Sequence, residues 1–76
     1  MPSRVIDVPG PHDEEAIRRG MREFADLEWT PEKKRPREVR VHPESVSGVL
    51  PDFIDGVRIR ICYTRAPSVL EMDILV

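Results

Sequence analysis

The predicted fold depends on residues 57–64, VRIRICYT, in which apolar and polar side chains alternate. One set consists of Val57, Ile59, Ile61 and Tyr63, and the other consists of Arg58, Arg60, Cys62 and Thr64. Successive side chains of a strand point to opposite faces of a sheet. The pattern therefore predicts a strand with one face packed on a core and an arginine-bearing face turned towards water or a partner.

The segments on either side of this strand predict its neighbours in the sheet. Residues 69–76 alternate again after the short loop RAPS at 65–68, and such a loop favours an antiparallel hairpin. Before the strand, Asp55-Gly56 is a good two-residue turn, so residues 51–54 form either a further hairpin strand or part of an irregular connection. Because prolines and glycines interrupt residues 43–56, we expect a packed irregular segment there with one or two helical turns.

The N-terminal half predicts a strand, a helix and a second strand. Residues 3–8 are rich in β-branched side chains and end at the Pro-Gly-Pro sequence of residues 9–11. Asp13 can cap a helix whose apolar stripe consists of Ile17, Gly20, Met21, Phe24 and Leu27. The position of Gly20 within this stripe indicates close packing of the helix on the sheet. Residues 38–42 alternate and stop at Pro43, which is typical of a strand.

These elements predict a single α+β domain over residues 1–76. Its simplest architecture has two layers, one amphipathic helix packed on a mainly antiparallel sheet of about four strands in the order β-α-β-β-β. The composition, 39% hydrophobic and 34% charged, suits a small core of marginal stability. Because residues 74–76 are apolar, the last strand either lies inside the sheet or offers an edge to a second chain.

Charge and composition argue against several broad classes. The net charge of −2 gives no overall attraction for nucleic acid or an anionic membrane, and no stretch resembles a membrane span or an export signal. We therefore expect a cytoplasmic protein. Cys62, His12 and His42 are scattered, with His42 expected at the surface, so we expect no metal site. Since no phosphate loop or nucleophile-base motif occurs, we also expect no cofactor and no enzymatic activity.

Basic residues are the main candidate binding feature. The candidate site residues are Arg40, Arg58 and Arg60 on strand faces, Lys33, Lys34 and Arg35 in the preceding loop, and Trp29 at the helix end. Arginines two residues apart on a strand can present several donors to phosphates or carboxylates. The favoured alternative is that Glu71 and Asp73 of a paired strand neutralise Arg58 and Arg60 as ordinary cross-strand ion pairs. Trp29 is either an interface anchor or a core residue.

These features favour a small non-catalytic module that binds another protein or assembles with itself, such as a phage or mobile-element accessory or inhibitor protein. The alternative is an RNA- or DNA-binding domain that uses the arginine face and the basic loop. Tyr63 weakens this alternative, because it falls on the face opposite the arginines. Residues 57–63 and the hairpin after them resemble the sheet of small RelE-type ribonuclease toxins. The resemblance implies RNA cleavage. Such toxins have two helices, whereas this sequence predicts one.

Overall fold

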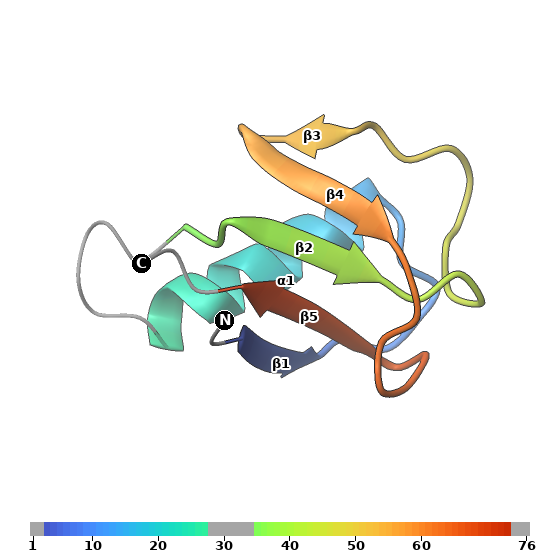
Figure 1. Cartoon of the computed structure of the whole chain (residues 1–76), viewed down its shortest axis with the longest axis horizontal. Coiled ribbons are helices and arrows are strands. Elements are labelled where there is room, and N and C mark those ends of the chain that lie inside the picture. Colours follow the sequence, from blue (N-terminus) through green and yellow to red (C-terminus); the bar gives the residue numbers. More distant parts are fainter. Residues whose placement is uncertain (1–2, 28–34, 74–76) are drawn as a thin grey trace.

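The computed structural model describes residues 3–27 and 35–73, which form two layers, a five-stranded sheet and one helix on one of its faces (Figure 1). In chain order the elements are β1 (Ser3–Asp7), α1 (Glu14–Leu27), β2 (Glu38–Val41), β3 (Phe53–Ile54), β4 (Val57–Ile61) and β5 (Val69–Asp73). The predicted α+β class and the mainly antiparallel sheet are confirmed, with five strands rather than about four.

The strands lie in the order β1-β5-β2-β4-β3, and of the neighbouring pairs only β2 and β4 run parallel. The predicted hairpin between the last two strands is wrong, because β2 lies between β4 and β5. A position inside the sheet suits β5, since its side chains Leu70 and Met72 are fully buried. Of the predicted strand over residues 69–76, the part that forms β5 therefore lies inside the sheet, and residues 74–76 lie outside the described residues. β1 and β3 are the edge strands.

The helix begins as predicted, because Asp13 caps it. The carboxylate of Asp13 accepts a hydrogen bond of 2.8 Å from the Ala16 N–H, and two acidic residues in the first turn complement the helix dipole. The buried side of α1 consists of Ala16, Ile17, Gly20 and Phe24, and it contacts β1 and β5. Among the described residues no helix has the length and apolar character needed to cross a membrane.

Close packing at Gly20 is also confirmed. A Cβ atom added to this residue would lie 2.7 Å from Cδ1 of Leu70, nearer than side chains approach one another. A side chain at this position would therefore require Leu70 to shift, and glycine lets the main chain of α1 approach β5 without that shift. This contact ties the centre of the helix to the centre of the sheet.

The tight turn between β3 and β4 confirms the hairpin alternative for residues 51–54. Asp55 and Gly56 both have positive φ angles, 52° and 78°, as a type I′ turn requires. The connection before β3 contains no helix, and where one or two helical turns were expected it has a hydrogen-bonded turn at residues 43–45, with the Ser45 N–H donating to the carbonyl of His42 (3.0 Å). Prolines and Gly48, whose φ is 71°, hold it in an irregular path instead. Val46 and Leu50 anchor this connection on the core.

The C-terminal end of β4 and the residues after it are less buried than the sequence predicts. Val57 and Ile59 are buried as expected, whereas Ile61 is 53% exposed and Tyr63 is 79% exposed, beyond the end of the strand. The reason is that α1 packs mainly on β1 and β5, which leaves the end of β4 uncovered. Tyr63 instead meets the ring of His42 edge-on, with ring centres 5.1 Å apart.

Removal of the helix cap gives a first stability prediction. We expect Asp13→Ala to lower the free energy of unfolding by about 1 kcal/mol, because the Ala16 N–H loses its acceptor. Asp13→Asn keeps an acceptor oxygen and serves as the matched control. Urea unfolding followed by circular dichroism measures both variants, and equal stability of the two would contradict the capping role.

Candidate functional site

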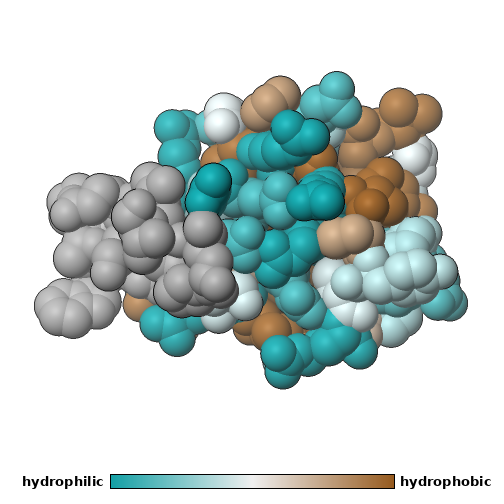
Figure 2. Space-filling view, viewed as in Figure 1, coloured by the Kyte–Doolittle hydropathy of each residue, from teal (hydrophilic) through white to brown (hydrophobic). Residues whose placement is uncertain are grey.

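The sheet face away from α1 carries alternating charges rather than a uniform cationic surface. Figure 2 shows hydrophilic side chains gathered over the middle of this face. The register aligns charged residues across β5, β2 and β4 in two rows, Asp73, Glu38 and Arg58 in one and Glu71, Arg40 and Arg60 in the next. Acids and arginines thus lie side by side on the predicted binding face.

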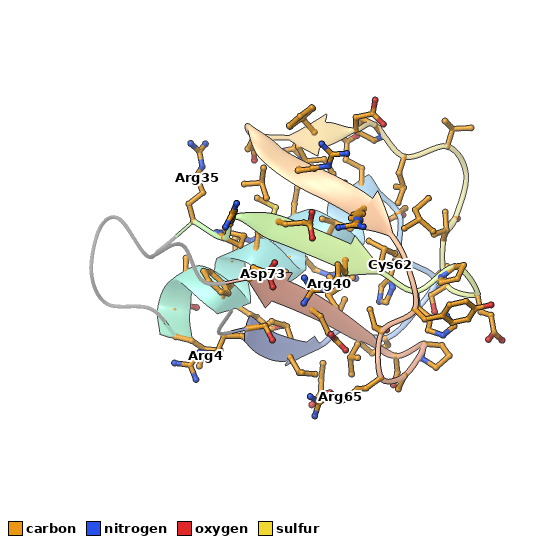
Figure 3. All side chains as sticks on the ribbon, viewed as in Figure 1. Arg4, Arg35, Arg40, Cys62, Arg65 and Asp73 are labelled. Atoms are coloured by element: carbon orange, nitrogen blue, oxygen red, sulfur yellow. The ribbon has the colours of Figure 1, made fainter. Side chains whose placement is uncertain are left out.

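Arg40 lies at the centre of this face and is surrounded by acids (Figure 3). Its guanidinium lies 2.7 Å from the Asp73 carboxylate, 3.4 Å from that of Glu38 and 3.6 Å from that of Glu71. Burial lowers the pKa of Arg40, but the hydrogen bond to Asp73 and the charges of the neighbouring acids outweigh it and leave the pKa raised. With 19% of its side chain exposed, Arg40 is a structural cation rather than a free donor for a ligand.

Arg58 and Arg60 lie on β4 and are not neutralised in the predicted way. Glu71 and Asp73 pair with Arg40, because β5 adjoins β2 and not β4. Arg60 lies 3.7 Å from Glu38 and is 61% exposed, whereas Arg58 makes no ion pair with any described residue. Together with Arg37, Glu38 and Asp73, the two arginines line a shallow hollow of about 490 Å³. The hollow contains both signs of charge, so it is not a dedicated anion site.

The remaining predicted site residues do not join this face. Figure 3 shows Arg35 away from Arg40, pointing out from the molecule. With Arg18 and Asp55 it lines a separate hollow of about 540 Å³ between α1 and the β3–β4 turn. There the hydrogen bond of 2.6 Å from Arg18 to Asp55, with the Asp55 charge, raises the pKa of Arg18. Trp29, Lys33 and Lys34 lie outside the described residues.

The two histidines are more buried than the cysteine, which is half-buried. No group of three or more His, Cys, Asp and Glu side chains placed to hold a metal occurs in residues 3–27 and 35–73. The expectation that His42 lies at the surface is wrong, since it is 5% exposed. His12 is fully buried and its Nε2, as the donor tautomer, lies 2.5 Å from the carbonyl of Val8. The other ring nitrogen of His12, Nδ1, is buried without a hydrogen-bond partner among the described residues, whereas Nδ1 of His42 accepts a hydrogen bond of 3.1 Å from the Glu44 N–H.

The free edge of β1 is a feature that sequence reasoning missed (Figure 1). Val8 N–H donates to the carbonyl of Ser68 (3.1 Å), so by alternation Ile6 exchanges hydrogen bonds with β5. The main-chain N–H and C=O groups of Val5 and Asp7 therefore point away from the sheet. No described residue forms a main-chain hydrogen bond with them. The edge at β3, in contrast, is a strand of two residues.

A groove runs between this edge and the outer flank of α1. It consists of two adjoining hollows of about 480 Å³ and about 340 Å³, which share Asp7, Glu23 and Asp26. The smaller hollow adds Val5, Ile6 and Leu27, and the larger adds Arg19 and Arg22 among others. We call it the β1–α1 groove. It places unpaired main-chain groups, apolar surface and charged side chains next to one another.

Searches of protein-family models, curated proteins and solved structures found no match to this chain. The geometry therefore carries the functional argument alone. The RelE-type resemblance depended on a hairpin formed by the last two strands, and β2 separates them. The hairpin on which this resemblance depended is therefore absent from the described sheet.

Proposed function

We propose that the chain is a small non-catalytic protein-interaction module that binds an extended segment of another chain at the free edge of β1. The observation that carries the proposal is the outward direction of the main-chain groups of Val5 and Asp7 beside the β1–α1 groove. Strand addition uses such groups for affinity and the adjoining groove for specificity. Such a module suits an accessory or inhibitory role beside a larger protein, in the cytoplasm.

The nucleic-acid alternative has less support. Arg40 is held by three carboxylates, and Glu38 also approaches Arg60. The described part of that face exposes no aromatic side chain near the arginines except Phe53, which lies beside Arg58 at the edge. A nucleic acid would meet acidic and basic side chains in equal number on this face, so its phosphates would gain little electrostatic attraction.

The proposal predicts that Val5→Pro abolishes binding without unfolding the protein. Proline removes the outward N–H of Val5 and leaves the hydrogen bonds between β1 and β5 intact, and proline is tolerated at such edge positions. Peptides selected from a random phage-displayed library on the immobilised chain provide the ligands. Their binding is measured by fluorescence anisotropy, and nuclear magnetic resonance maps the perturbed amides, expected in residues 3–8 and 22–27.

Val5→Thr is the matched control, because it changes the side chain and keeps the N–H. We expect it to bind the selected peptides as the parent does, while Val5→Pro loses binding and keeps the circular dichroism spectrum of the parent. Equal binding by the folded proline variant would overturn the proposal, as would peptides that perturb only β3 and β4. A library that yields no binding peptide would also count against it.

A further inference from the structure

We infer that the segment bound in the β1–α1 groove is basic on the side that faces the helix, with lysine or arginine alternating with apolar residues. This inference rests on the proposed function, since it names the partner that the edge accepts. It concerns the chemistry of the groove rather than the existence of the edge. An experiment can therefore contradict this inference without contradicting the proposed function.

The charges of the groove support a basic occupant. Glu23 and Asp26, three residues apart on α1, line both hollows beside β1, and neither forms an ion pair with a described residue. The larger hollow also contains Arg19 and Arg22, whereas the charged side chains that line the smaller hollow, beside Val5 and Ile6, are all acidic. Unpaired carboxylates beside an open edge disfavour an acidic strand and favour a cationic one. Leu27, 52% exposed in the same hollow as Val5, adds apolar surface for the stem of a long basic side chain.

Strand geometry determines which partner residues meet these acids. Val5 lies opposite Glu71 on the open face of the sheet, while Ile6 and Val8 point into the core towards the helix. In a strand added beside β1, every second side chain would likewise point to the helix side, where Glu23 and Asp26 lie. An alternating basic and apolar sequence is the pattern that fits this arrangement.

A second copy of this chain fits the groove poorly. Pairing two β1 strands antiparallel about Val5 would place both helices on the same face of a joined sheet. Because the charged side chains that line the smaller hollow beside residues 5–7 are all acidic, the smaller hollows of the two copies would then bring acids together. Like charges in such a contact oppose association, so the argument favours a partner of different sequence.

Two synthetic peptides test the inference, one in which valine alternates with lysine and one in which valine alternates with glutamate. We expect the lysine peptide to bind the parent chain, and the glutamate peptide to bind at least about tenfold more weakly. Binding of the lysine peptide should weaken as salt is added. The double variant Glu23→Lys with Asp26→Lys should instead bind the glutamate peptide more tightly than the lysine peptide.

Glu15→Lys with Glu44→Lys makes the same change in net charge away from the groove and serves as the matched control, which should retain the lysine preference. If Val5→Pro abolishes peptide binding but the charge reversal at residues 23 and 26 changes nothing, the inference is wrong and the proposed function stands. If Val5→Pro binds both peptides as the parent does, the proposed function is wrong as well. Equal binding of the two peptides, or no binding by either while library peptides bind, also overturns the inference.

Discussion

Arg40→Met is expected to cost about 2–4 kcal/mol of the free energy of unfolding at neutral pH. The substitution leaves Glu38, Glu71 and Asp73 close together without their central cation, each with less than a fifth of its side chain exposed. Asp73 suffers most, because Arg40 is its ion-pair partner at 2.7 Å. A domain of this size has roughly 4–11 kcal/mol of stability in total, so the loss is a large fraction of it.

The pH dependence of this variant has a definite sign. In the parent, the raised pKa of Arg40 means that its stabilisation is complete at every pH below the ordinary arginine value and is lost only in strong alkali. In Arg40→Met, the three carboxylates repel one another when ionised and are relieved when they take up protons. The stability gap between parent and variant should therefore narrow as the pH falls through the range where carboxylates titrate.

The same substitution on the neighbouring strand is the control. Arg58 makes no ion pair with a described residue, so Arg58→Met should change the stability by no more than about 0.5 kcal/mol. Thermal and urea unfolding of the two variants from acidic to neutral pH measure the difference. Equal stability of both variants at neutral pH would show that the acids around Arg40 do not depend on it.

Local signals in the sequence were sufficient for the parts of the fold that depend on neighbouring residues. The cap at Asp13, the contact at Gly20 and the Asp55-Gly56 turn follow from short-range steric and hydrogen-bonding rules, and all three are present. The alternation in residues 57–61 likewise gives the inner and outer faces of β4 correctly. Where the helix covers only part of the sheet, as at Ile61, periodicity alone overstates burial.

Strand order was the information that the sequence lacked. Whether a short loop forms a hairpin or carries the chain across another strand depends on how much apolar surface each arrangement buries, which is a property of the whole sheet. The insertion of β2 between β4 and β5 changed the partners of Glu71 and Asp73 from the arginines of β4 to Arg40. β1 is an edge because β5 is its one strand partner in the described sheet, which also depends on strand order, so the candidate site could not be found from residue types alone.

Gly20→Val is the second substitution for which we expect a large effect, a loss of about 3 kcal/mol or more. The added Cβ alone would lie 2.7 Å from Leu70 Cδ1, 3.1 Å from Met72 Cε and 3.3 Å from Val8 Cγ2, and two further methyl groups have no room among these buried side chains. Gly20→Ala is the more informative variant, because helix propensity favours alanine by about 1 kcal/mol whereas overpacking costs about 1–3 kcal/mol.

Helix propensity and overpacking oppose one another at Gly20. Residue 19 of α1 is exposed, so substitutions there measure helix propensity alone. Arg19→Ala should be about 1 kcal/mol more stable than Arg19→Gly, since only propensity differs there. At position 20 the order should be reversed, with glycine the more stable residue. Leu70→Val removes the nearest methyl group, so the double variant with Gly20→Ala should lose less stability than the two single variants combined. If the protein is more stable with alanine than with glycine at both positions, the side chains of the sheet shift to accept the added methyl group. The close contact at Gly20 would then not hold the two layers in place.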